Sequence, residues 1–270
     1  MELLPALLIY LLTGCVAGVL AGLFGIGGGL IIVPALILVF TLQGFDAAIL
    51  TQLAIGTSLA TIVVTGLSAA RSHHQKAAVR WPVFIALAPG LAVGVWAGAW
   101  LAAWLPGQQL QGLIGIFALL VAVQMGLGLK PKPSRDLPGK PVLLAVGTLL
   151  GSISALFGIG GGSLTVPFLS WCNVRMQEAV GTAAACGVPI AFFGAMAYAV
   201  AGWSVAGLPM GSSGYLYWPA FVGIVATSAL CARVGARLAH RLSADKLKRV
   251  FAVFLLVLGI QFIARSLGAL

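Results

Sequence analysis

The chain has 270 residues, of which 61% are hydrophobic and only 7% are charged, with a mean hydropathy of +1.11 and a formal net charge of +10. A soluble domain could not bury this much apolar surface, whereas apolar runs of about 20 residues are what crossing a hydrocarbon core requires. The composition therefore excludes a soluble protein and predicts an all-α polytopic membrane protein.

The first half of the chain alternates long apolar segments with short polar connections. We expect helices over 3–23, 47–70, 81–106 and 108–129, with a short apolar piece over 34–42 and a turn at 43–46. Basic residues mark a connection over 71–80 and a proline-rich stretch over 130–141. We place the boundary between two repeats in that stretch, giving a first repeat over 1–130, a linker over 131–140 and a second repeat over 141–270.

One glycine-rich stretch occurs twice, as Gly22-Leu-Phe-Gly-Ile-Gly-Gly-Gly-Leu-Ile-Ile-Val-Pro34 and as Ala155-Leu-Phe-Gly-Ile-Gly-Gly-Gly-Ser-Leu-Thr-Val-Pro167. Each interior glycine costs about 1 kcal/mol of helix stability relative to alanine. The prolines also push Val33 and Val166 out of the α region. Each copy is therefore predicted to be a helix, an irregular break, and a short helix that restarts with proline in its first turn.

Further motifs recur in the same order. The segment Gln177–Ala183 matches Gln52–Ser58, and Trp218-Pro219 matches Trp81-Pro82. We interpret the chain as an internal duplication in a single membrane domain.

Most lysines and arginines fall in three clusters. These are Arg71, Lys76 and Arg80; Lys130, Lys132, Arg135 and Lys140; and Arg233, Arg237, Arg241, Lys246, Lys248 and Arg249. The positive-inside rule assigns all three to the cytoplasmic side. The positive charge therefore predicts contact with anionic lipid headgroups, and the short basic loops argue against a nucleic-acid partner.

Four simple spans in each half would place the third cluster outside. That position conflicts with the positive-inside rule. The conflict disappears if each glycine-rich element makes no net crossing of the membrane, because all three clusters then lie inside and both termini outside. The two halves acquire opposite orientations, as in transporters built from inverted-topology repeats. Parallel repeats with eight spans are the alternative.

The paired breaks are the predicted binding site. Irregular backbone at membrane depth persists only where it is buried in protein or lines a cavity. A restarted helix leaves unpaired N–H groups with partial positive charge, which suits a small oxyanion. The candidate residues are Gly25, Gly27, Gly28, Gly29, Gln52, Thr57, Ser58, Gly158, Gly160, Gly161, Gly162, Ser163, Gln177 and Thr182, with Thr165 as a further neutral donor. The alternatives are that the glycines only allow close helix packing and that each threonine bonds its own backbone.

The duplicated Gly-Ile-Gly-Gly-Gly with Val-Pro beyond it, followed by Ala-Ile-Gly-Thr-Ser or Ala-Val-Gly-Thr, resembles the sulfite exporter TauE/SafE family. The resemblance covers nearly the whole chain and implies a bacterial or organellar inner-membrane permease for sulfite, sulfoacetate or related organosulfur anions. Its motif falls on Gly25 to Gly29, Pro34, Thr57, Gly158 to Gly162, Pro167 and Thr182. The two halves differ at one position of this motif, because the second half has Ala183 where the first half has Ser58.

Other reactive residues point to little chemistry. The four cysteines have no paired spacing and no nearby histidine, so we expect no metal and no cofactor. Cys186 is the one cysteine that we include among the candidate substrate-binding residues, because it follows Thr182 by one helical turn and its thiol could contact a sulfur anion. Asp46 and Glu178 could carry a coupling proton, although we expect both at the membrane surface. No nucleophile–base pair is visible, which argues against an enzyme.

These observations predict a secondary transporter that moves a small sulfur-containing anion by alternating access, with a proton or counter-ion as a possible coupling partner. An anion channel and a non-transporting membrane scaffold are the competing hypotheses. The sequence leaves the oligomeric state open.

Overall fold

A computed structural model describes residues 3–24, 29–127, 136–239 and 244–267. In the first half these form α1 (Leu3–Phe24), α2 (Gly29–Leu42), α3 (Leu50–Gln75), α4 (Trp81–Trp104) and α5 (Gly107–Gly126). In the second half they form α6 (Lys140–Phe157), α7 (Gly162–Trp171), α8 (Met176–Ala201), α9 (Trp218–Ala239) and α10 (Ala244–Ser266). A short antiparallel hairpin of β1 (Ser212–Ser213) and β2 (Leu216–Tyr217) connects α8 to α9.

Within the described residues, six helical segments are long and apolar enough to cross a membrane, namely α3, α4, α5, α6, α8 and residues 249–266 of α10. The prediction of an all-α, multi-pass membrane protein is confirmed. Most predicted bounds are close to the observed ones. Helix α2, however, begins at Gly29 instead of at 34, and α3 continues to Gln75 and includes Arg71, which the sequence assigns to the connection.

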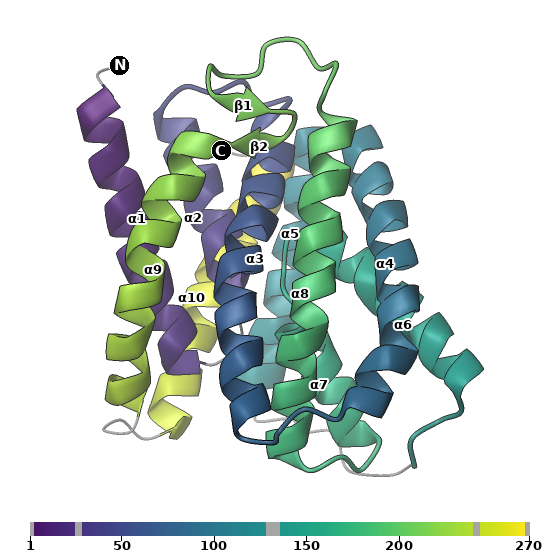
Figure 1. Cartoon of the computed structure of the whole chain (residues 1–270). Coiled ribbons are helices and arrows are strands. Elements are labelled where there is room, and N and C mark those ends of the chain that lie inside the picture. Colours follow the sequence, from purple (N-terminus) through teal and green to yellow (C-terminus); the bar gives the residue numbers. More distant parts are fainter. Residues whose placement is uncertain (1–2, 25–28, 128–135, 240–243, 268–270) are drawn as a thin grey trace.

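The two ends of the bundle carry different features (Figure 1). Helix α1 begins and helix α10 ends at the upper end, where the β1–β2 hairpin also lies. The α3–α4 connection and the first turns of α6, α8 and α10 lie at the lower end. Lys76, Arg80 and Lys140 therefore lie at the end of the molecule opposite the hairpin.

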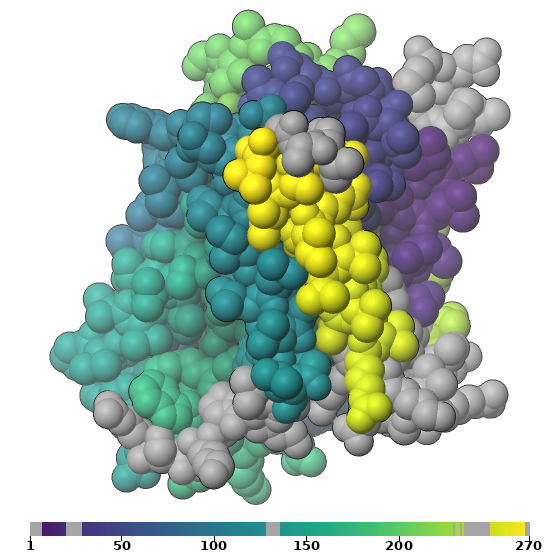
Figure 2. Space-filling model, turned by 180° about the vertical axis from the view of Figure 1, so that it is seen from behind, coloured from purple at the N-terminus to yellow at the C-terminus, as the bar shows by residue number. Residues whose placement is uncertain are grey.

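The main helix pairs each take one helix from each half of the sequence. Helix α1 packs along α9, and α4 packs along α6 (Figure 1). Helices α5 and α10 lie side by side on the face shown in Figure 2, and α3 packs on α8 in the interior. The pair α1–α9 corresponds to the pair α6–α4 when the two halves are exchanged, so the packing follows the duplication seen in the sequence.

Small residues bring these paired helices together. A Cβ at Gly14 of α1 would lie 2.6 Å from the carbonyl oxygen of Ile224 in α9, and a Cβ at Gly94 of α4 would lie 1.9 Å from that of Thr148 in α6. Only glycine allows backbones to approach this closely. Gly14 and Gly94 therefore lie on the packing faces of their helices.

The prolines of the repeated motif do not occupy first turns, so that part of the prediction is wrong. Helix α2 begins at Gly29 and α7 at Gly162, which places Pro34 and Pro167 inside the helices. A proline there removes one backbone hydrogen bond. Helix α2 nevertheless continues through fully buried Val33, because its sides pack against the protein core along most of its length.

Candidate functional site

The second glycine-rich copy interrupts the helix as predicted. Helix α6 ends at Phe157, and Gly158 adopts a left-handed conformation with φ of +64°, which glycine tolerates without strain. The N–H of Ile159 donates to the carbonyl oxygen of Ser154 at 3.0 Å and closes the end of the helix. The chain resumes as α7 at Gly162.

In the first copy, α1 ends at Phe24 and α2 begins at Gly29. The predicted site residues Gly25, Gly27 and Gly28 lie outside the described residues.

The two copies meet inside the helical bundle. A Cβ at Gly29 would lie 2.6 Å from the carbonyl oxygen of Gly158 and 2.8 Å from the Cα of Ile159. The hydroxyl of buried Ser58 in α3 donates to the same Gly158 oxygen at 3.1 Å. Backbone segments far apart in the sequence are thus in direct contact where α6 ends and α2 begins.

The glycines of the second break face different surroundings. A Cβ at Gly161 would lie 2.7 Å from the carbonyl oxygen of Ala183 and 2.9 Å from the backbone nitrogen of Gly187, both in α8. The nearest contact of a Cβ at Gly160 would be the Ile62 side chain at 3.4 Å. Close helix packing, our alternative interpretation, therefore accounts for Gly161, whereas Gly160 makes no close backbone contact within the described residues.

Three hydroxyl groups around the second break are buried and have no hydrogen-bond partner among the described residues. They belong to Ser154 of α6 and to Ser163 and Thr165 of α7. Buried polar atoms are nearly always hydrogen-bonded, so each such exception calls for an explanation. Each of these hydroxyls can donate to a ligand that accepts hydrogen bonds.

The start of α7 adds backbone donors to these hydroxyls. The first N–H groups of any α-helix lack an intrahelical partner, and the N-cap residue Gly161 makes no side-chain capping bond. The helix dipole places partial positive charge at this end. Because residues 141–174 contain no charged side chain, the donors of this region are neutral.

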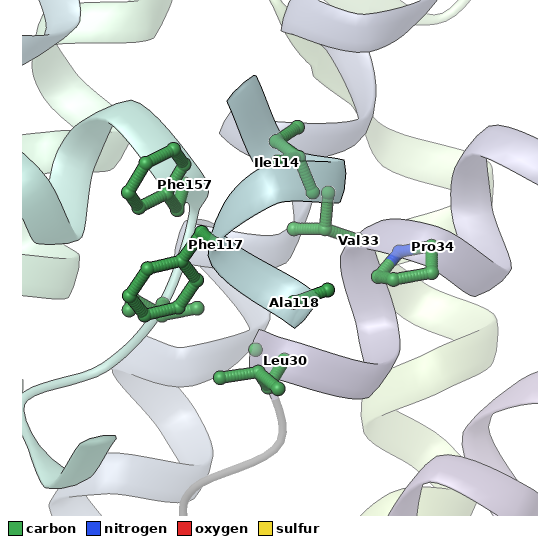
Figure 3. Close-up of a pocket in the computed structure, with 9 residues that line it drawn as sticks. Leu30, Val33, Pro34, Ile114, Phe117, Ala118 and Phe157 are labelled. Carbon is green, nitrogen blue, oxygen red and sulfur yellow. The ribbon is translucent and has the colours of Figure 1, made fainter. Parts of the chain in front are cut away.

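The opposite side of the junction is apolar. Figure 3 shows a small hollow between α2, α5 and the end of α6, lined by Leu30, Val33, Pro34, Ile114, Phe117, Ala118 and Phe157, with Gly29 and Ile159 also contributing. The rings of Phe117 and Phe157 stack with centroids 4.5 Å apart. The junction therefore offers hydrogen-bond donors near α7 and apolar contact near α5.

The predicted ligands Thr57 and Thr182 make contacts elsewhere. The hydroxyl of Thr57 accepts a hydrogen bond from the backbone N–H of Tyr217 at 3.0 Å, just before α9. The hydroxyl of Thr182 accepts one from the backbone N–H of Arg80 at 2.9 Å, just before α4. Each threonine thus joins its own half of the chain to the other half.

The two glutamines occupy unlike positions. The side-chain amide of buried Gln52 donates to the carbonyl oxygens of Ala102 and Leu105, at 3.4 and 2.9 Å, and so holds the corner between α4 and α5. Gln177 is exposed in the first turn of α8. Of the predicted polar ligands, the structure places Ser58 and Ser163 at the breaks, whereas Gln52 and Gln177 have other surroundings.

The remaining candidates are a thiol and two carboxylates. Cys186 is fully buried in α8, one turn beyond Thr182. The Asp46 carboxylate accepts a hydrogen bond from the backbone N–H of Ala48, and Glu178 pairs with Arg175 at 2.6 Å. Asp46 lies in the turn before α3, and Glu178 lies in the first turn of α8.

Sequence reasoning missed two residues beside the second break. Ser154 stands out only as a hydroxyl in an apolar helix, at a position where the first copy has Ala21. Tyr198 of α8 donates its hydroxyl to the carbonyl oxygen of Ala155 at 3.1 Å. No sequence signal connects Tyr198 to the break, because the contact depends on how α8 packs against α6.

Comparisons with known proteins agree with the resemblance seen in the sequence. A family model described as sulfite exporter TauE/SafE matches residues 10–262. A probable membrane transporter protein of Haemophilus influenzae is 35% identical over 256 residues, covering 94% of this chain and 97% of that protein. The probable membrane transporter protein YunE of Bacillus subtilis is 26% identical over 274 residues, covering 94% of this chain and 96% of YunE. No solved structure matches the chain.

Proposed function

Because this chain belongs to the sulfite exporter TauE/SafE family and is a multi-pass membrane transporter of the bacterial inner membrane, we propose that it moves a small sulfur-containing oxyanion such as sulfite or an organosulfonate. The observation that carries the proposal is the contact between the two glycine-rich breaks, with Gly29 against Gly158 and Ile159. Paired broken helices that meet inside a transporter are where such proteins bind ions.

The second break holds the oxygen atoms of the anion in this proposal. The N–H groups at the start of α7 and the hydroxyls of Ser154, Ser163 and Thr165 replace the water that surrounds the anion in solution. Neutral donors hold an anion firmly enough to select it and weakly enough to release it. The apolar hollow beside Phe117 and Phe157 borders the same junction, at Gly29 and Ile159.

We propose that the two halves are inverted-topology repeats. Two observations support this: α1–α9 and α6–α4 are equivalent pairs, and helix α1 begins at the same end of the bundle at which α10 ends. The end that carries Lys76, Arg80 and Lys140 is assigned to the cytoplasm by the positive-inside rule. Alternating access then exposes the junction to one side of the membrane at a time.

Counterflow in proteoliposomes tests the transport activity. Vesicles loaded with unlabelled sulfite or sulfoacetate are diluted into trace radiolabelled anion, and labelled anion should accumulate transiently with saturable dependence on the external concentration. Flux that does not saturate would indicate a channel. Vesicles with no flux for either anion would support a membrane scaffold and contradict the proposal.

A matched pair of variants ties the flux to the junction. Gly160→Val adds methyl groups at the break, and the one contact of its Cβ among the described residues is the Ile62 side chain at 3.4 Å, so the protein should fold and lose counterflow. Gly66→Ala in α3 is the control, because its Cβ would meet nothing closer than 3.8 Å. Normal flux in a folded Gly160→Val protein would place the anion elsewhere.

A further inference from the structure

We propose that Thr57 and Thr182 are positioning residues of two matched gates, one at each end of the molecule, and that the parts that move are the exchanged helix pairs α1–α9 and α6–α4. This inference rests on the proposed transport function. It reassigns both threonines, which the sequence suggested as anion ligands.

The first gate lies at the end of the molecule that carries the hairpin. Thr57 in α3 accepts the backbone N–H of Tyr217 at 3.0 Å. A Cβ at the preceding Gly56 would lie 2.2 Å from the carbonyl oxygen of Tyr215. The Gly-Thr pair of α3 is therefore in direct contact with the backbone that leads into α9.

The second gate has the same construction at the opposite end. Thr182 in α8 accepts the backbone N–H of Arg80 at 2.9 Å. A Cβ at the preceding Gly181 would lie 2.2 Å from the carbonyl oxygen of Ala78. In both gates a Gly-Thr pair from one half of the chain contacts the residues just before the Trp-Pro start of a helix in the other half. Two contacts of identical design at opposite ends are what alternating access needs.

The strength of the contacts indicates which parts separate. The glycine-lined pairs α1–α9 and α4–α6 pack over their lengths with backbone in close contact, so each pair should move as one body. Each gate, in contrast, is one Gly-Thr pair against a single backbone segment, although α4 also packs on α8 beside the second gate. Water can replace the threonine hydroxyl bond, and one such bond shifts an opening equilibrium by about fivefold. Opening the first gate moves α9 with α1 away from α3, and opening the second moves α4 with α6 away from α8.

The gates differ in their surroundings. Beside the second gate, Glu178 lies 4.0 Å from the Arg80 guanidinium and 2.6 Å from that of Arg175. Beside the first gate, Tyr217 packs against the rings of Tyr10 and Phe40, with centroids 6.0 and 5.7 Å away. Because salt screens surface charges, high ionic strength should loosen the second gate and leave the first unchanged.

Two buried positions can report each gate separately. Cys186 lies one turn inward from Thr182 and is fully buried, and Thr61 occupies the matching position one turn inward from Thr57 and is also fully buried. One reporter protein keeps Cys186 as its only cysteine, with the other three changed to alanine. The other reporter also carries Cys186→Ala and has Thr61→Cys as its only thiol.

A membrane-impermeant maleimide is applied to sealed vesicles of each orientation. Thr182→Val should raise the labelling rate of Cys186 about fivefold, only from the face that carries Arg80, and Thr182→Ser should return it to the starting rate because it keeps the hydroxyl. Thr57→Val should likewise raise the labelling rate of the thiol at position 61 about fivefold, and only from the opposite face of the membrane. Valine has nearly the same shape as threonine, so both variants should fold.

Unchanged labelling rates in both valine variants would contradict the gate proposal. A rate that rises equally from both faces would also contradict it, because it would indicate a general loosening of the protein. Sulfite and sulfoacetate counterflow measured on the same vesicles separates the two proposals. Flux without one-sided labelling removes the gates and leaves the transport function. One-sided labelling without flux supports the gates and overturns the proposed substrate.

Discussion

The two glycine-rich breaks share a sequence motif and differ in the side chains that follow them. After the second break come Ser163 and Thr165, whose buried hydroxyls have no partner in the part of the chain that the structure describes. At the matching positions after the first break come Leu30 and Ile32, which pack in the apolar core. The difference indicates that duplication supplied two interrupted helices, and that divergence then gave the second the hydrogen bonding and the first the apolar contact.

The largest effect is expected where the two breaks meet. In Gly29→Val the new side chain would overlap the backbone of Gly158 and Ile159, at 2.6 and 2.8 Å, and backbone cannot move aside as a flexible side chain can. Overpacking of this kind costs roughly 1–3 kcal/mol, sometimes more. Counterflow should be abolished and the Tm in detergent should fall. A Gly29→Val protein with wild-type flux and Tm would show that the contact does not matter.

The next effect separates binding from stability at the second break. Thr165→Val removes a buried hydroxyl that has no partner, and burying such a group costs about 1–3 kcal/mol. The variant should therefore have a higher Tm without substrate, yet bind the anion about tenfold more weakly because a charged ligand loses a hydrogen bond. Measuring the Tm at increasing anion concentrations gives both the stability without anion and the anion affinity.

The matched variant at the first break is Ile32→Val. It should lower stability by about 0.5–1.5 kcal/mol and leave anion affinity unchanged. If Ile32→Val weakened binding and Thr165→Val did not, the assignment of roles to the two breaks would be reversed.

A third prediction concerns the paired glutamines. Gln52→Leu removes both hydrogen bonds to the α4–α5 corner and should lower stability by about 1–3 kcal/mol with anion affinity unchanged. Gln177→Leu, at an exposed position of α8, should change neither quantity. Loss of affinity in a stable Gln177→Leu protein would instead favour a binding site near the start of α8.

The smallest effect is expected from Ser58→Ala. It removes the hydrogen bond to the Gly158 oxygen and should lower stability by about 1 kcal/mol. Thr148→Ala is the control, because the Thr148 hydroxyl bonds within its own helix, to the carbonyl oxygen of Leu144 at 3.1 Å. A Ser58→Ala protein with the same thermal stability as the Thr148→Ala protein would show that the Ser58 bond does not hold the junction together.

The sequence predicted the parts of the fold that depend on one segment at a time. Long apolar runs located the spans, and the second run of glycines located the break between Phe157 and Gly162. A run of glycines weakens the helix in which it occurs, and the length of an apolar segment decides whether that segment can span the membrane. Both effects depend on one segment alone, so the sequence was enough to identify these features. Pro167 misled because proline can lie inside a helix when the surrounding packing compensates for the lost bond.

The parts of the site that depend on packing between halves could not be predicted. The repetition of Thr57 and Thr182 pointed to a shared function, but their partners lie before the Trp-Pro helices of the opposite half. A duplicated sequence does not say that α1 pairs with α9 or α6 with α4. For the same reason Tyr198 and its bond to Ala155 had no signal in the sequence.

An anomalous difference map of crystals grown with selenite, the selenium analogue of sulfite, tests the central claim most directly. The account predicts a selenium peak between Gly29 and the start of α7, with selenite oxygens within hydrogen-bonding distance of the Ser163 or Thr165 hydroxyl. A peak away from both breaks, in a protein that transports selenite, would contradict it.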